Sequence, residues 1–159
     1  MLFRSKDEDT YIAAWTTTPW TLPSNLALCV GDHIEYTKIF DEESKKHIIL
    51  ATKRLETLPA SKSYRVVSSF SGGDLVGKQY ESLFPYFESK RDQGAFQIVS
   101  DDYVSIESGT GIVHQAPAFG EDDFRILNAA GISAMVCPID MEGRLDRKST
   151  RLNSSHVKR

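Results

Sequence analysis

The order of apolar and polar residues along the chain predicts many short strands. Apolar, β-branched and aromatic residues recur in short blocks over residues 10–15, 26–30, 35–40, 47–50, 64–70, 95–99, 103–106 and 135–139. Gly, Asp, Ser or Pro residues separate most of these blocks. Short apolar blocks bounded by turn residues are typical of strands. We therefore expect a mainly β fold of the α+β class.

Two charged segments mark the turns of expected hairpins. Residues 41–46 separate the blocks 35–40 and 47–50, and residues 4–9 precede the block 10–15. The block 26–30 is apolar throughout, which predicts a strand buried on both faces or placed in a small barrel.

Two further segments carry a helical pattern. Ala51, Leu55 and Leu58 recur at helical spacing before a proline, which predicts a short helix covering one side of the sheet. Residues 121–123 are acidic and Gly131 follows the next apolar residues, as at the start and end of a helix. Residues 75–87 mix apolar and polar residues without a period, and we expect an irregular segment there.

Composition and charge indicate one domain followed by a basic tail. The chain has 159 residues, of which 40% are hydrophobic, and a net charge of −3. Five of its Lys and Arg residues lie in the last thirteen positions, and the remainder carries 14 Lys and Arg against 22 Asp and Glu. We expect a domain over residues 1–145 and a disordered, non-native tail over residues 146–159. A body of charge −8 lacks the positive field for binding along a duplex, so any nucleic-acid contact should be local.

The cysteines and the hydropathy pattern favour an intracellular, cytoplasmic protein. Cys29 and Cys137 stand far apart inside apolar runs, where an unbridged cysteine packs as a small apolar residue. We find no apolar run of membrane-spanning length and no export-type segment at the start of the chain. We expect no contact with a membrane.

Residues 15–25, Trp-Thr-Thr-Thr-Pro-Trp-Thr-Leu-Pro-Ser-Asn, are the first candidate for chemistry. Thr16, Thr17 and Thr18 place hydroxyls on both faces of a strand end, and the prolines then stop regular pairing. The segment should form a fixed turn lined by hydroxyls. A purely structural turn explains these residues equally well, because threonine is a good strand former and proline is common in loops.

A second candidate runs from Gly109 to Phe124, Gly-Thr-Gly-Ile-Val-His-Gln-Ala-Pro-Ala-Phe-Gly-Glu-Asp-Asp-Phe. It should place His114 at a strand end and Asp123 in the first turn of a helix, at one end of the sheet. Taken singly, a carboxylate there is more often a helix cap and a lone histidine more often a surface group.

Together, the two segments resemble the editing domain of isoleucyl-tRNA synthetases, an insertion called connective polypeptide 1. The resemblance covers residues 7–145 and implies a compact, barrel-like β domain with peripheral helices. Related valyl and leucyl editing domains carry Thr-Thr-Arg-Pro in the first segment and lack a histidine at position 114. The residues around Gln115 and Phe119 are closer to the eukaryotic cytosolic type. The resemblance stops near Leu145, which predicts a truncated domain with an open sheet edge.

The resemblance also implies roles for single residues. Asp123 matches the aspartate that holds the α-ammonium group of the substrate, and His114 matches the residue that limits the size of the amino-acid side chain. The residues that match the pocket and the water-positioning groups are Thr16, Thr17, Thr18, Thr21 and Asn25. Trp20 lies in the same segment and either shapes the site or anchors the packing.

The implied activity is hydrolysis of valine wrongly esterified to the 3′ end of the isoleucine tRNA, or of valyl-adenylate, within a larger synthetase. We expect no metal and no cofactor, because threonine hydroxyls, a carboxylate and water suffice for ester hydrolysis. The His-Ile-Gly-His and Lys-Met-Ser-Lys-Ser type motifs of amino-acid activation, which uses ATP, are absent from this sequence. The alternative is a noncatalytic fragment that binds the aminoacylated tRNA end or docks on the parent synthetase.

Three other kinds of site fit the residues less well. A Ser-His-Asp hydrolase would need a Gly-x-Ser-x-Gly turn, which the sequence lacks. A metal site from His114, Glu121 and Asp123 lacks the usual ligand spacing. No complete phosphate-binding loop motif occurs.

Overall fold

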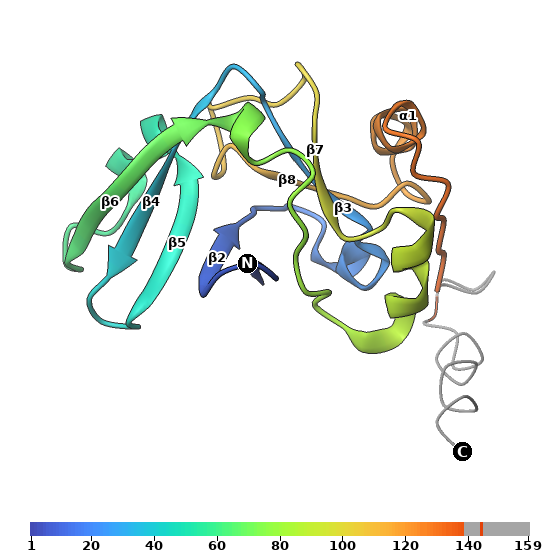
Figure 1. Cartoon of the computed structure of the whole chain (residues 1–159), viewed down its shortest axis with the longest axis horizontal. Helices are drawn as coiled ribbons and strands as arrows, with labels where there is room; N and C mark the ends of the chain where they lie inside the picture. The colour runs from blue at the N-terminus through green and yellow to red at the C-terminus, as the bar shows by residue number, and fades with distance from the viewer. Residues whose placement is uncertain (139–143, 145–159) are drawn as a thin grey trace.

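The larger of two sheets has five strands (Figure 1). The computed structural model describes residues 1–138 and residue 144. The strand order is β1, β2, β5, β4, β6. These strands are β1 (Leu2–Arg4), β2 (Thr10–Ala13), β4 (Glu35–Asp41), β5 (Lys46–Ala51) and β6 (Tyr64–Ser71). All neighbours are antiparallel except β2 and β5, which run parallel.

The smaller sheet contains the most deeply buried strand. β3 (Ala27–Val30) lies between β7 (Gln97–Ser100), to which it is parallel, and β8 (Val113–Gln115), to which it is antiparallel. All four residues of β3 are fully buried, as its apolar composition predicted. Because β8 ends beside the start of β3, the residues that precede β3 and those that follow β8 lie at the same end of the sheet.

Both predicted hairpins are confirmed. β1 and β2 pair around residues 5–9, and β4 and β5 pair around residues 42–45. An isolated bridge between Trp15 and Val113 connects the extension of β2 to the smaller sheet. In the described part of the chain the sheets do not close, so the mainly β, α+β class is confirmed and the barrel-like closure is not.

The helices are short and lie beside the sheets. They are the 3₁₀-helices η1 (Pro19–Ser24), η2 (Thr52–Thr57), η3 (Gly72–Asp74) and η4 (Pro85–Gln93), and the α-helix α1 (Glu121–Ala129). The predicted acidic start of α1 is confirmed, and Gly131 follows its end with a φ of 74°. The predicted helix over residues 51–58 was wrong as a cover of the core: η2 is a 3₁₀-helix without a buried residue, and Ala51 ends β5.

Two predicted strands do not form. Residues 103–106 are a loop, because Asp101 turns the chain by accepting the N–H of Tyr103 with its carboxylate (3.0 Å). Residues 135–138 alternate between exposed and buried, as a strand would, but they belong to neither sheet, and residue 139 lies outside the described residues. Cys137 is exposed there, contrary to expectation, while Cys29 is buried in β3. The predicted tail, residues 146–159, also lies outside the described residues.

The core fills the space between the two sheets. Its largest fully buried side chains include Phe3, Tyr36, Tyr80, Leu28 and Ile98, drawn from both sheets and from the segment between η3 and η4. Tyr36 also donates a hydrogen bond to the carbonyl of Gly111 (2.7 Å), so the core ties down the loop that leads into β8.

Gly111 should tolerate no side chain. Its φ is 72°, and a Cβ there would lie 2.5 Å from Cβ of Ala51. We expect Gly111→Ala to lower the free energy of unfolding by about 2–4 kcal/mol, from left-handed strain and overpacking together. Gly131→Ala is the matched control, because Gly131 has a φ of 74° and open space around it. Equal losses for the two variants in urea denaturation would contradict the close contact.

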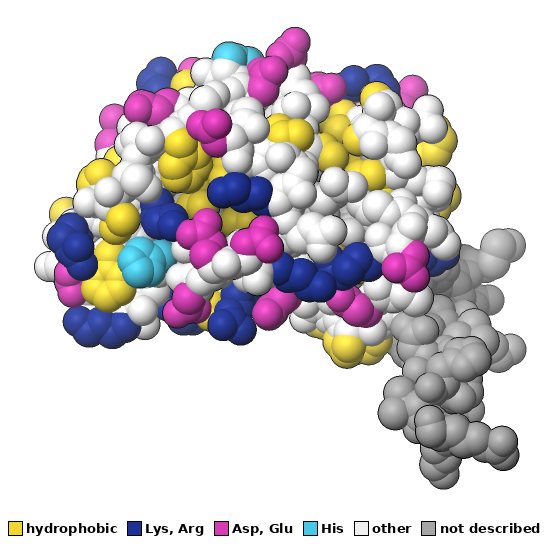
Figure 2. Space-filling model, viewed as in Figure 1, with side chains coloured by type: hydrophobic (Ala, Val, Ile, Leu, Met, Phe, Trp, Pro, Cys, Tyr) yellow, Lys and Arg dark blue, Asp and Glu magenta, His cyan; other side chains and the backbone are white. Residues whose placement is uncertain are grey.

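Charges of both signs are mixed on the surface. Figure 2 shows Asp and Glu side chains among Lys and Arg side chains on one face. Ion pairs such as Arg4 with Glu81 (3.4 Å) join opposite charges. Among the described residues no helix is long and apolar enough to cross a membrane.

Candidate active site

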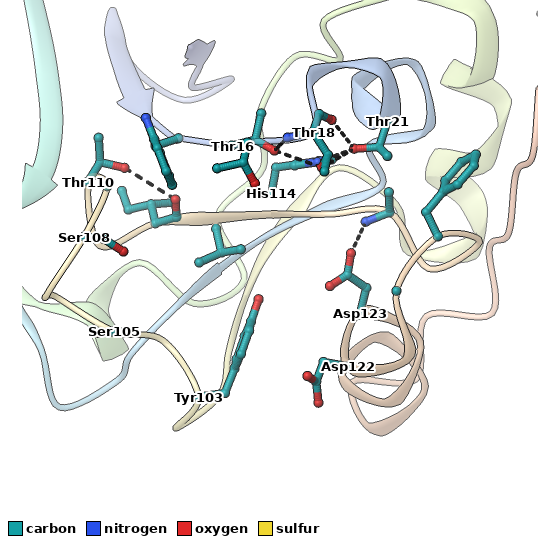
Figure 3. A pocket seen from close by; sticks show the side chains of 18 of the residues that line it. Thr16, Thr18, Thr21, Tyr103, Ser105, Ser108, Thr110, His114, Asp122 and Asp123 are labelled. Atoms are coloured by element: carbon teal, nitrogen blue, oxygen red, sulfur yellow. Dashed lines mark hydrogen bonds between the residues drawn. The ribbon is translucent and has the colours of Figure 1, made fainter.

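A cavity of about 600 Å³ opens where the threonine segment, the loop before β8 and the start of α1 meet (Figure 3). Seven of the eight predicted site residues line it: Thr16, Thr17, Thr18, Trp20, Thr21, His114 and Asp123. The eighth, Asn25, is buried behind His114 and does not line the cavity. The two segments identified in the sequence therefore meet at one place.

The threonine segment forms one wall of this cavity. The main-chain N–H of Thr18 donates to the hydroxyl of Thr16 (3.0 Å), and the hydroxyls of these two residues lie 3.2 Å apart. Pro19 then starts the 3₁₀-helix η1. The side chain of Thr17, in contrast, makes no hydrogen bond within the described part of the chain and belongs to an exposed residue. Its hydroxyl is available to a substrate or to water.

His114 lies within a buried chain of hydrogen bonds. Its Nε2 lies 2.9 Å from the hydroxyl of Thr21, which donates its own hydrogen to the carbonyl of Thr18 (2.8 Å). Nε2 must therefore carry the hydrogen in this pair. Nδ1 is then an acceptor, and it faces Nδ2 of Asn25 at 3.4 Å. The Asn25 amide is fixed in turn, because Nδ2 donates to the carbonyl of Ala27 (2.9 Å) and the hydroxyl of Tyr80 donates to Oδ1 (2.6 Å).

This environment keeps His114 neutral. Burial lowers its pKa from the usual 6.5 to about 4, and the residue is 6% exposed. A general base works best with a pKa near the working pH. His114 is thus suited to shaping the cavity and unsuited to taking a proton at neutral pH.

The low pKa of His114 predicts a loss of stability in mild acid. The unfolded chain takes up a proton below about pH 6.5 whereas the folded chain resists it, so stability falls as the pH falls toward 4. We expect the free energy of unfolding to decrease by about 2 kcal/mol between pH 7 and pH 5 from this group. Urea denaturation at both pH values, compared with His114→Gln, isolates the effect. An equal decrease in the variant would contradict it.

Asp123 occupies the side of the cavity formed by α1. Its carboxylate accepts the main-chain N–H of Ala116 (2.8 Å), which ties the start of the helix to the end of β8. Burial raises the pKa of Asp123. Residue 120 is a glycine, which leaves room for the Asp123 carboxylate. A Cβ at residue 120 would lie 3.0 Å from the carboxyl carbon of Asp123. A half-buried carboxylate at the wall of a cavity is a binding group for a cation such as an ammonium.

Several residues that line the cavity were given no role from the sequence. Trp15, Thr110 and Phe119 lie inside the two candidate segments, whereas Tyr103, Ser105 and Ser108 lie outside them. The density of hydroxyl groups around Gly109 was a usable signal for the serines and for Thr110. Tyr103 could not be found in that way, because its block was interpreted as a strand.

Arg54 holds the loop that carries these residues. Its guanidinium donates to the carbonyls of Gly109 (2.9 Å), Glu107 (3.3 Å) and Ile106 (3.4 Å). The main-chain N–H of Ala51 adds a bond to the carbonyl of Thr110 (2.9 Å). The end of β5 and the helix η2 that follows it thereby fix the wall that faces the threonines.

One surface group in the described part of the chain has ligands close enough together to share a metal ion. It consists of Asp32, His33 and Asp102, all exposed. None of the three lines the cavity. His114, Glu121 and Asp123 do not form such a group.

Comparisons with known proteins identify the sequences and folds to which this chain is similar. The chain is 46% identical over 158 residues to the cytoplasmic isoleucine–tRNA ligase of Saccharomyces cerevisiae, covering 95% of this chain and 15% of that protein. It is 51% identical over 137 residues to the isoleucine–tRNA ligase of Bdellovibrio bacteriovorus, covering 85% and 13%. Since a eukaryotic and a bacterial relative are similarly close, the eukaryotic type stays a prediction. No family model matches the chain.

The fold is shared with solved editing domains. The cytosolic leucyl-tRNA synthetase editing domain of P. falciparum has a TM-score of 0.69 at 12% identity, covering 96% of this chain and 63% of that one. The corresponding domain of P. knowlesi has a TM-score of 0.59 at 13% identity, covering 76% and 50%. The chain spans about one seventh of the length of the isoleucine–tRNA ligases that it matches. By sequence the chain belongs with the isoleucyl-tRNA synthetases, of which it matches one part, and by fold it has the architecture of the leucyl-tRNA synthetase editing domains.

Proposed function

We propose that this chain hydrolyses the ester between valine and the terminal adenosine of the isoleucine tRNA. The observation that carries the proposal is the joint placement of the threonine wall, neutral His114 and the Asp123 carboxylate around one cavity. A hydrophobic pocket separates isoleucine from valine by only about 1–3 kcal/mol, so a second site that removes the smaller product is needed. That two-site remedy is a known solution of this enzyme class.

Each wall of the cavity has a part in the proposed reaction. Asp123 binds the α-ammonium group of valine and so fixes the ester carbonyl relative to the threonines. The hydroxyl of Thr17, which is not engaged within the described chain, is available to stabilise the oxyanion or to position the attacking water. His114 limits the space for the amino-acid side chain. Water is the nucleophile, and the proposed reaction needs no metal or cofactor.

A serine hydrolase mechanism at this site has little support from the geometry. Nε2 of His114 donates its hydrogen bond to the hydroxyl of Thr21, and the low pKa of the imidazole disfavours proton uptake at neutral pH. No serine hydroxyl is hydrogen-bonded to His114 in the described residues. Threonines and water at the same wall require no such partner.

The proposed partners are the 3′ end of the mischarged tRNA and the rest of a synthetase. The mixed surface charges favour a local contact over one that runs along a duplex. Trp20 is 64% exposed at the cavity, where an aromatic ring can stack on a nucleobase. A cytoplasmic location, as in the name of the yeast relative, belongs to the same proposal.

The direct test is deacylation of valyl-tRNA for isoleucine by the purified chain. We expect hydrolysis above the buffer rate for the valyl ester and no acceleration for the isoleucyl ester. A cooperative thermal transition should first show that the sample is folded. A folded sample that binds the valyl-tRNA but leaves the lifetime of the ester unchanged would show a noncatalytic binding fragment instead.

A further inference from the structure

Tyr103 lines the cavity on the wall opposite the threonines (Figure 3). It follows the turn at Asp101, and 37% of the residue is exposed. The figure shows its ring rising from the loop toward the cavity between Ser105 and the start of α1. The proposed reaction assigns no role to this side chain.

The hydroxyl of Tyr103 is held from behind by Gln115. Nε2 of Gln115 lies 2.7 Å from the hydroxyl, and Gln115 is fully buried in β8. Nε2 also lies 3.4 Å from the carbonyl of His114, which can only accept a hydrogen. This contact identifies the atom as the amide nitrogen, so Gln115 donates and the Tyr103 oxygen accepts.

This orientation leaves the hydrogen of the Tyr103 hydroxyl unused. No acceptor for it is present among the described residues. Burial raises the pKa of Tyr103 far above neutral pH, which keeps the hydroxyl protonated. The cavity therefore contains a neutral hydrogen-bond donor opposite the threonine wall.

The groups of the proposed substrate differ in what they can accept. The ammonium group has no acceptor and is assigned to Asp123. The ester carbonyl is assigned to the threonines, and the valine side chain is apolar. The remaining acceptors belong to the terminal adenosine: its sugar oxygens, its base nitrogens and the phosphate on its 5′ oxygen.

We propose that Tyr103 binds the terminal adenosine of the substrate by donating its hydroxyl hydrogen, and that Gln115 is the positioning residue for this hydroxyl. This inference rests on the proposed function. The Oε1 atom of Gln115 is buried without a partner in the described residues, so the side chain is kept at the cost of an unsatisfied acceptor. The hydrogen bond from Nε2 of Gln115 to the Tyr103 hydroxyl is the favourable interaction that offsets this unsatisfied acceptor.

The test compares two ligands that share the aminoacyl group. One is the non-hydrolysable amide analogue of valyl-adenosine, and the other is valinamide, which lacks the nucleoside. We expect Tyr103→Phe to weaken binding of the analogue about three- to tenfold, the usual effect of one hydrogen bond. Binding of valinamide should stay unchanged. NMR titration of the full chain measures both.

The possible outcomes separate the two proposals. Equal weakening of both ligands, or no weakening of either, would overturn the role of Tyr103 while leaving the proposed function intact. Failure of the unaltered chain to bind the analogue would overturn the proposed function, and the inference with it.

A second variant tests the positioning role. Gln115→Met should reproduce the loss seen for Tyr103→Phe, and the double variant should lose no more than either single variant. Losses that simply add would show that Gln115 does not act through Tyr103. Because Gln115 is buried, its variant is used only if its thermal transition is cooperative, and Tyr103→Phe alone still decides the contact with the nucleoside.

Discussion

Replacing Asp123 by asparagine should lower kcat/KM for valyl-tRNA hydrolysis by about 30-fold or more. The carboxylate is half-buried, and in the proposed complex it faces the α-ammonium group away from bulk water. Removing one partner of such a charge pair costs about 2–5 kcal/mol, and each 1.4 kcal/mol is about a factor of ten. Steady-state deacylation at neutral pH measures the loss.

The same substitution should leave the fold intact. Burial raises the pKa of Asp123, so ionising this group opposes folding as the pH rises above its ordinary value of 3.8. Asparagine removes that cost and can still accept the N–H of Ala116. We therefore expect an unchanged or higher free energy of unfolding at neutral pH. A large loss of stability would assign Asp123 to the scaffold.

Asp122→Asn is the matched control for this prediction. Asp122 is the preceding residue of α1, and its side chain is 67% exposed and paired with Arg125 (3.5 Å). The Asp122→Asn substitution removes one negative charge from the same helix turn and leaves the Asp123 carboxylate in place. If both variants lost activity equally, the general negative potential of the helix start would be responsible, and specific binding of the ammonium group would be refuted.

Sequence patterns within a few neighbouring residues were sufficient to predict most of the strands and α1. The continuous apolar run of β3, the charged turn between β4 and β5 and the acidic start of α1 each depend on neighbouring residues. The parallel pairs β2–β5 and β3–β7 join segments far apart in sequence, and no local pattern specifies them. Local patterns also failed at residues 103–106, where the Asp101 side chain competes for the backbone.

The site residues likewise fall into those that local sequence predicts and those that depend on distant contacts. The threonines, His114 and Asp123 were found because they stand in two distinctive segments. The neutral state of His114 could not be predicted, because it depends on Thr21, 93 positions away, and on the burial of both residues. Tyr103 was missed for a similar reason: its partner Gln115 lies on another element.

Replacing His114 by alanine should make the isoleucyl ester a substrate. The imidazole is packed into the wall of the cavity and is fixed at both nitrogens, by Thr21 and by Asn25. A wall fixed in this way cannot move aside for the extra methylene of isoleucine without breaking two hydrogen bonds. Its removal opens more space than one methylene needs. We expect deacylation of isoleucyl-tRNA to increase at least about tenfold, the range associated with fitting one methylene.

His114→Gln is the control that separates the effect of side-chain volume from an effect of the imidazole on the reaction. Glutamine fills most of the same volume and can both donate to Thr21 and accept from Asn25, so rejection of the isoleucyl ester should persist. In both variants hydrolysis of the valyl ester should continue, because a histidine with a pKa of about 4 supplies no base at neutral pH. If His114→Gln lost valyl activity as completely as Asp123→Asn, the imidazole would have to take part in the reaction itself. If His114→Ala still rejected isoleucine, another residue of the cavity would have to set the size limit.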